Sequence, residues 1–171
     1  MPLIPATDAD LRAVAALVNS GFRGETSRQG WTTEADFLDG ERTDEAALRA
    51  DLHDKPEARL YLLRQDVDLA GCVWLEPTKP GVWYLGMLTV RPDLQDRHLG
   101  RQLLGQAEAI ARDGGARRIQ MTVIHIRHEL IAWYERRSYV QTAETKPFPY
   151  ESPFGRANRP DLHFVVLEKL L

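Results

Sequence analysis

The chain has 171 residues, 43% hydrophobic and 27% charged, a composition typical of one folded domain. Its net charge of −3 argues against a general nucleic-acid binder, which needs a strongly basic surface. No apolar run approaches the roughly 18 residues of a membrane helix, no signal-peptide pattern opens the chain, and the single Cys72 excludes an internal disulfide. We expect a soluble, cytoplasmic single domain over residues 1–171, with no metal, nucleic-acid or membrane partner.

The first part of the chain predicts two helices around a polar segment. Leu11, Val14 and Val18 form an apolar stripe at helical spacing, and Gly21 is a suitable stop. The predicted elements are, in chain order, an edge strand at 3–5, a helix at 7–21, a polar segment at 22–44 with a short helix opened by Thr33, and a helix at 45–52.

The rest of the chain alternates between strand and helix periodicity. The predicted elements are strands at 59–65, 69–76 and 82–90, a helix at 99–113, a strand at 118–124, a helix at 129–137, and strands at 139–145 and 163–170 around a proline-rich loop at 147–161. This order predicts a layered α/β fold with a mixed sheet.

The strand–helix–strand unit over 82–124 is the most informative part of the sequence. A unit of this length predicts two parallel strands joined by a right-handed crossover, with a ligand near the N-terminus of the helix. Cations gather at that N-terminus, although the free amides there prefer an anion. They are Arg91, Arg97, His98 and Arg101. A bound phosphate would satisfy the amides and the arginines together. Alternatively, Asp96 caps the helix and the arginines extend into water.

The same segment carries a recognisable motif. Residues 90–104 resemble the acetyl-CoA signature of the GCN5-related N-acetyltransferases, V-x-P-x-x-[QR]-x-x-G-x-[GA]. Gln95 matches its Gln/Arg position and Gly100 its last position, and His98 stands in place of its first glycine. The resemblance implies an acyl-CoA N-acyltransferase fold: a mixed, mostly antiparallel sheet with a central parallel splayed strand pair and helices on both faces.

A second segment supports the resemblance. Residues 132–140 are similar to the family's Y-E-x-x-G-F segment, with Ser138 in the glycine place and Tyr139 in the phenylalanine place. Arg127 stands seven residues before Tyr134, where the family often has asparagine.

The resemblance implies how acetyl-CoA, the co-substrate, is held. The two central strands would splay apart, and the main chain of Leu88, Thr89 and Val90 would pair with the pantetheine arm and acetyl group. Main-chain amides would hold the pyrophosphate. These belong to Gln95, Asp96, Arg97, His98, Leu99, Gly100 and Arg101. We expect His98 to keep an allowed backbone conformation with its ring outward, either contacting a phosphate or as a tolerated loop residue.

The implied reaction transfers acetyl directly to the amine of a small molecule, a protein N-terminus or a lysine. Tyr134 is the implied proton donor to the leaving thiolate, since a phenol with a pKa of about 10 is protonated at neutral pH. A lysine-like amine is neutral only about four times in ten thousand at pH 7, so it needs a base or a desolvating pocket. The candidate bases are Glu25, Glu34 and His125. Acidic residues in 22–44 hint at a cationic acceptor, and a homodimer is common in the family.

Other residues have more than one interpretation. Aromatic side chains can wall the acceptor pocket or seal a dimer contact. They are Phe22, Trp31, Phe148, Tyr150 and Phe154. Cys72 lies in an apolar strand and is predicted to be a buried thiol, not a nucleophile. His125 and His128 form an H-x-x-H pair with no further predicted metal ligands.

Two competing functions remain. The departures at His98, Arg127 and Ser138 motivate a non-catalytic acyl-CoA-binding or regulatory domain on the same fold, whereas Tyr134 argues against it. A dinucleotide-binding oxidoreductase is poorly supported, because the first strand–helix unit lacks G-x-G-x-x-G and an acidic ribose partner.

Overall fold

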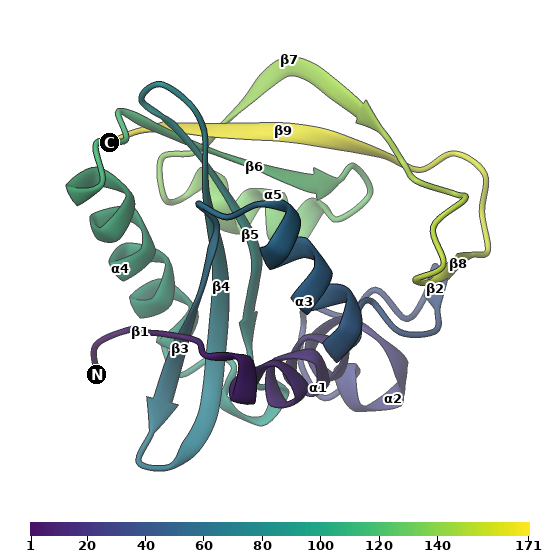
Figure 1. Cartoon of the computed structure of the whole chain (residues 1–171). Coiled ribbons are helices and arrows are strands. Elements are labelled where there is room, and N and C mark those ends of the chain that lie inside the picture. Colours follow the sequence, from purple (N-terminus) through teal and green to yellow (C-terminus); the bar gives the residue numbers. More distant parts are fainter.

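A central mixed sheet organises the molecule, which is described over residues 1–171 by a computed structural model. Its seven strands lie in the order β1-β3-β4-β5-β6-β9-β7 (Figure 1). Only β5 and β6 run parallel; every other neighbouring pair is antiparallel. The bounds are β1 (Ile4–Pro5), β3 (Arg59–Gln65), β4 (Asp68–Lys79), β5 (Val82–Val90), β6 (Arg118–Ile124), β7 (Val140–Pro147) and β9 (His163–Leu170). The α/β fold class with a mostly antiparallel sheet and one parallel pair is confirmed.

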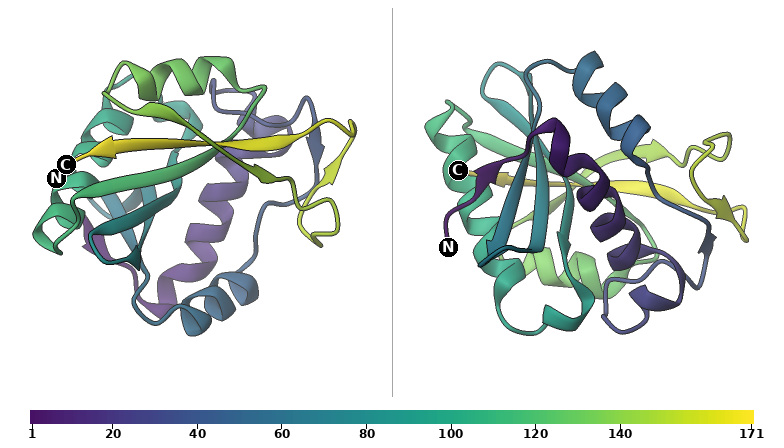
Figure 2. Two further views of the ribbon diagram at one scale, coloured as in Figure 1. Left: turned by 90° about the horizontal axis from the view of Figure 1, so that it is seen from above. Right: turned by 60° about the horizontal axis from the view of Figure 1, so that its bottom comes forward.

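Helices cover both faces of this sheet (Figure 2). Their bounds are η1 (Asp8–Asp10), α1 (Leu11–Phe22), α2 (Gly24–Ser27), α3 (Glu45–Asp54), η2 (Pro92–Leu94), α4 (Leu99–Asp113) and α5 (His128–Glu135). The alternating strand pattern builds two cores. Cys72 and Trp74 pack with α1 and α3, whereas Val73 and Leu75 pack with α4 and α5.

The central parallel pair separates after three residues. Val82, Trp83 and Tyr84 of β5 lie opposite β6, and from Leu85 onward β5 has no partner on that side. β6 continues along β9 up to Ile124. On the other side of β5, a register shift against β4 places Met87 at a φ of 48°, which is the geometry of a β-bulge. The bulge bends β5, and the two strands enclose a wedge.

Most predicted elements are confirmed, but the polar segment differs. No helix begins at Thr33; its hydroxyl instead bonds the hydroxyl of Ser27 at 2.6 Å and accepts the amide of Ala35 at 3.1 Å. The short helix is α2, nine residues earlier. The proline-rich loop also contains β8 (Arg156–Ala157), which pairs with β2 (Leu38–Asp39). No helix has the length and apolar character needed to cross a membrane.

Candidate active site

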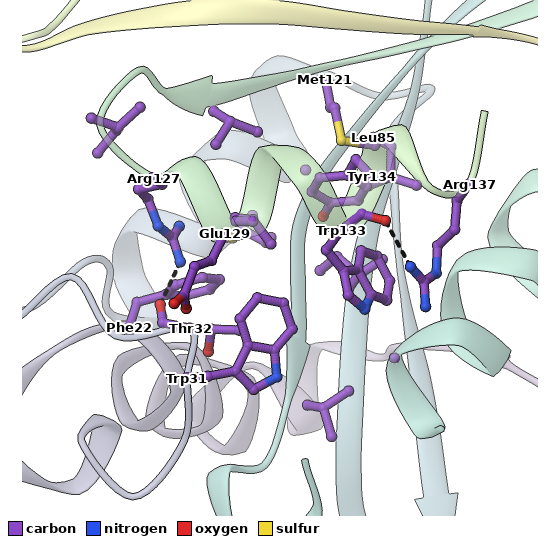
Figure 3. Close-up of a pocket in the computed structure, with 18 of the residues that line it drawn as sticks. Phe22, Trp31, Thr32, Leu85, Met121, Arg127, Glu129, Trp133, Tyr134 and Arg137 are labelled. Atoms are coloured by element: carbon purple, nitrogen blue, oxygen red, sulfur yellow. Dashed lines mark hydrogen bonds between the residues drawn. The ribbon is translucent and has the colours of Figure 1, made fainter. Parts of the chain in front are cut away.

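One deep cleft of about 680 Å³ occupies the wedge between β5 and β6 (Figure 3). The strand walls are residues 84–88, Val90 and residues 121–124. Helix α5 and the segment around Trp31 close the other sides, and Trp31 faces Trp133 with ring centroids 6.2 Å apart. We call the part near residues 95–101 the α4 end, and the part lined by Phe22, Thr32, Glu34, Arg42 and Arg127 the Phe22 end.

The α4 end offers uncapped amides. His98 is the N-cap of the helix and makes no side-chain cap bond, and the first turn holds no acidic residue. Asp96 accepts no hydrogen bond and is exposed, so the alternative that Asp96 caps the helix is wrong. The amides that open α4 are therefore free for an anion, which the positive end of the helix favours.

Cations without carboxylate partners surround these amides. Arg97, Arg101, Arg136 and Arg137 take part in no salt bridge. The Arg137 guanidinium lies 3.6 Å from the Trp133 ring centroid, and its buried Nε has no partner. Burial lowers the pKa of Arg137, and repulsion by Arg136 and Arg101 lowers it further. The arrangement is suited to phosphate groups.

His98 and Ser138, which replace glycines of the family motifs, keep the backbone conformation that glycine favours. His98 has φ 63° and Ser138 has φ 71°, both in the left-handed region that favours glycine. Asp96 adopts the same region with φ 64°. Histidine and aspartate enter this region more readily than most residues, so the loop keeps its path without glycine. The His98 ring is exposed, as expected, at the rim of the cleft.

The structure brings most, but not all, of the predicted coenzyme-binding residues to the cleft. Its lining includes Leu88, Val90, Gln95, Asp96, His98, Gly100 and Arg101. Thr89 and Leu99 are instead buried in the interior, and Arg97 is exposed outside the cleft. These three residues can act here only through their main chain or, for Arg97, through long-range charge.

The Gln95 side chain has a role that the motif did not reveal. Its Oε1 accepts the amide of Trp31 at 2.9 Å, and its Nε2 donates to the Thr32 hydroxyl at 2.9 Å and the Val90 carbonyl at 3.2 Å. A Cβ on Gly30 would lie 2.4 Å from Oε1, so a larger residue there would displace the Gln95 amide. Gln95 thereby ties the loop at the α4 end to the segment that closes the cleft.

Tyr134 occupies the centre of the cleft. The residue is 5% exposed, and its ring packs edge-on against Trp133 and Tyr139. Its hydroxyl makes no hydrogen bond within the protein and points into the cleft (Figure 3). Burial raises the pKa of Tyr134 to about 12, partly offset by the charge of Arg127. The phenol therefore stays protonated at neutral pH.

The predicted bases differ greatly in environment. Glu34 is 5% exposed and pairs with Arg23 at 3.2 Å and Arg127 at 2.9 Å, so both oxygens are occupied. The Glu25 side chain is 91% exposed and pairs with Arg28, and Glu25 does not line the cleft. Glu25 as a base thus stays a prediction without support from the geometry.

His125 lies away from the cleft lining. Its ring stacks on that of His163 with centroids 3.9 Å apart, and its Nδ1 lies 3.3 Å from the His163 amide. No cluster of three or more His, Cys, Asp or Glu side chains is arranged to hold a metal ion.

Several cleft residues were not predicted from sequence. Glu129 lines the cleft, is exposed and takes part in no salt bridge, and Arg42 packs over the Phe22 ring at 4.6 Å. Arg127, noted only as a departure from the family motif, binds Glu34 and the Thr32 carbonyl. The Arg127–Glu34 contact joins residues 93 positions apart, so no local pattern indicates it.

Two of the five aromatic residues predicted to wall the acceptor pocket line the cleft. Phe22 and Trp31 line the cleft, whereas Phe148, Tyr150 and Phe154 do not. Phe148 packs instead against Phe164, with ring centroids 5.8 Å apart. Outside the cleft, Cys72 is fully buried, and this burial raises the pKa of its thiol to about 12, as expected for an inert side chain.

Known structures share this architecture. Ribosomal-protein-alanine N-acetyltransferase from Brucella melitensis aligns over 100% of both chains with a TM-score of 0.70 and 17% identity. Ribosomal-protein-S18-alanine N-acetyltransferase from Escherichia coli aligns over 98% of this chain and 92% of its own, with a TM-score of 0.70 and 16% identity. A GNAT family acetyltransferase from Elizabethkingia anophelis with acetyl-CoA bound covers 71% of this chain and 82% of its own, with a TM-score of 0.62 and 16% identity. At these identities the likeness establishes the fold.

The family follows from the sequence match. The acetyltransferase (GNAT) family model matches residues 25–139, well over half of the chain, so the chain belongs to this family of acetyltransferases. Comparison with curated protein sequences gives no match. The predictions of an acyltransferase, and of acetyl-CoA as its co-substrate, are confirmed at the level of the family.

Proposed function

We propose that the protein transfers the acetyl group of acetyl-CoA directly to an amine that enters the cleft from the Phe22 end. The observation that carries this proposal is the protonated Tyr134 hydroxyl in the middle of one continuous cleft. Arg137 from the α4 end, and Arg127 and Arg42 from the Phe22 end, all act electrostatically on this hydroxyl. Tyr134 therefore lies where the two substrates would meet.

The α4 end is suited to the phosphates of the coenzyme. Free amides at the start of α4 would bind the pyrophosphate, and Arg101, Arg136 and Arg137 would neutralise its charge. The unpaired side of β5 beyond Tyr84 would receive the pantetheine arm as an added strand. Leu88 and Val90 line this side of the cleft.

The chemical step needs one proton donor and one neutral amine. The amine nitrogen attacks the thioester carbonyl carbon, a C–N bond forms, the C–S bond breaks, and the thiolate leaves. The Tyr134 hydroxyl donates its proton or a hydrogen bond to the departing sulfur. It is suited to this because burial keeps its pKa at about 12.

The amine must lose a proton before or during the attack. Both oxygens of Glu34 already accept from arginines, so its carboxylate is committed to these two ion pairs. Glu129 lines the cleft without a salt bridge, so we propose that it accepts the proton, directly or through water. A Glu129→Gln variant should raise the pH at which half-maximal kcat/KM is reached, whereas Glu25→Gln, the matched control outside the cleft, should leave the profile unchanged.

The proposal is tested by measuring coenzyme binding and turnover separately. Calorimetry should show binding of acetyl-CoA and CoA, and release of the CoA thiol should depend on an added amine. Binding without amine-dependent thiol release over a broad amine panel would identify a non-catalytic acyl-CoA-binding domain instead. No binding of either compound would refute both functions.

A further inference from the structure

Arg42 is a cation without a protein partner in the wall of the cleft. Its guanidinium donates no hydrogen bond to the protein and takes part in no salt bridge. Nη1 is enclosed and unpartnered, while Nε and Nη2 are not among the enclosed atoms and so remain accessible. The main chain is fixed, because the Arg42 amide donates to the Asn19 side chain at 2.7 Å. This cation is thus positioned but not neutralised.

The residues around Arg42 provide no anionic partner for its guanidinium group. The carboxylate of Glu34 already serves Arg23 and Arg127, so it cannot also neutralise Arg42. Arg42 and Arg127 approach the same Phe22 ring, at 4.6 and 5.5 Å from its centroid. The Phe22 ring satisfies part of the Arg42 charge by a cation–π contact but accepts no conventional hydrogen bond. Clustered guanidinium groups of this kind are stabilised by an oxyanion, which their fork geometry matches.

We propose that Arg42 determines acceptor specificity by binding an oxyanion, a carboxylate or a phosphate group, carried by the acceptor amine. This inference rests on the proposed acetyl transfer, since it assigns the Phe22 end to the acceptor. Acidic residues in 22–44 favour a cationic acceptor, but Asp36, Asp39 and Glu41 do not line the cleft. Glu34 does line it, but its carboxylate is already paired with Arg23 and Arg127. The acceptor is then a small amino acid or amino phosphate, with its amine toward Tyr134 and its oxyanion toward Arg42.

The catalytic test compares amines with and without an anion. The pairs are glycine with glycinamide, β-alanine with β-alaninamide, and 2-aminoethyl phosphate with ethanolamine. Because the anion also changes the pKa of the amine, kcat/KM is expressed per neutral amine, and on this basis the anionic member should be at least about tenfold better, the usual effect of hydrogen bonds to a charged group. The carboxylate and phosphate pairs show which oxyanion is preferred. Arg42→Met should remove the advantage by raising KM for the anionic member, and an advantage that persists in Arg42→Met would overturn the proposal.

A binding test works even if none of these amines is acetylated. With CoA saturating the α4 end, inorganic phosphate or acetate should raise the Tm of the wild type but not of Arg42→Met. Arg49→Met is the matched control, because Arg49 pairs with Asp8 and Glu45 on the surface outside the cleft. Its anion response should equal that of the wild type. Equal responses in all three proteins would overturn the proposal. An Arg42-dependent response without amine turnover would support the oxyanion site and count against acetyl transfer.

The stability of Arg42→Met gives a third readout, which shows whether a loss of activity comes from misfolding. Arg42→Met removes an unpaired cation and keeps much of the apolar stem that packs on Phe22. The variant should therefore be at least as stable as the wild type without added anion. A large loss of stability in Arg42→Met would show instead that Arg42 serves the fold, and would overturn its role as a site for acceptor binding.

Discussion

The two ends of the cleft are built on different principles. The α4 end offers main-chain amides from one short segment, so His98 can stand in place of glycine provided that the backbone keeps its left-handed turn, although Arg136 and Arg137 reach this end from α5. The Phe22 end depends on side chains from distant segments. There Glu34 pairs with both Arg23 and Arg127, and Arg127 lies 93 positions after Glu34. A main-chain site is fixed by its fold, whereas a side-chain site can change its ligand through a few substitutions.

Tyr134 lies between the two ends, and its replacement should have the largest effect. We expect Tyr134→Phe to lower kcat by about 100-fold or more, the usual contribution of a general acid. The affinity for acetyl-CoA should change little, because the phenol makes no hydrogen bond that holds the cleft together. Calorimetry and steady-state kinetics on the same preparation measure both effects. Full turnover in Tyr134→Phe would remove this residue from the mechanism.

The Phe22 end should also be the more fragile end. Glu34→Ala leaves Arg23 and Arg127 buried without a carboxylate, and such a loss costs about 3–5 kcal/mol of the free energy of unfolding. The matched control is Glu25→Ala, whose carboxylate pairs with Arg28 on the surface. An exposed pair of this kind contributes little to stability, because water and salt screen it, so Glu25→Ala should unfold close to the wild type. Urea unfolding compares the variants, and equal losses would show that the Glu34 pairs do not hold this end together.

The sequence predicts the α4 end better than the Phe22 end, because local patterns are visible in a sequence and contacts between distant segments are not. Strand 82–90, helix 99–113 and strand 118–124 are local patterns, and the structure has them with these bounds. The splay of the central strands was implied by the family resemblance. Arg42 and Glu129 carry no local signal, because their importance comes from where distant segments fold together. Thr33 was wrongly expected to open a helix, since its hydroxyl bonds Ser27 instead of capping.

Alkaline pH should separate loss of stability from loss of catalysis. Burial raises the pKa of Tyr134 to about 12, above the value of about 10 in the unfolded chain. Its contribution to stability is therefore complete below pH 10 and is lost as pH rises from 10 to 12, by about 2–3 kcal/mol. The kcat should show no decline from Tyr134 ionisation between pH 7 and 10. Burial also raises the pKa values of Cys72 and Tyr139, so urea unfolding of the wild type is compared with that of Tyr134→Phe over pH 7–12 to isolate the contribution of Tyr134. A fall in kcat of the wild type with an apparent pKa near 10 would contradict the second statement.

The smallest predicted effects concern the two left-handed residues that stand where the family has glycine, Ser138 and His98. Ser138 is exposed and has φ 71°, so Ser138→Gly should relieve left-handed strain and stabilise the protein by up to about 1 kcal/mol. His98→Gly should have a smaller benefit, because histidine tolerates this region better. Ala109→Gly is the control, because it introduces glycine at a helical position within α4. It should lower the free energy of unfolding by about 1 kcal/mol.

The same variants then report on the coenzyme. If amides alone bind the pyrophosphate, His98→Gly should leave the affinity for acetyl-CoA within about twofold of the wild type, because 0.4 kcal/mol is about a factor of two. A loss of tenfold or more would show that the exposed His98 ring itself contacts a phosphate. In that case the α4 end would depend on side chains as the Phe22 end does, and the contrast between the two ends would no longer hold.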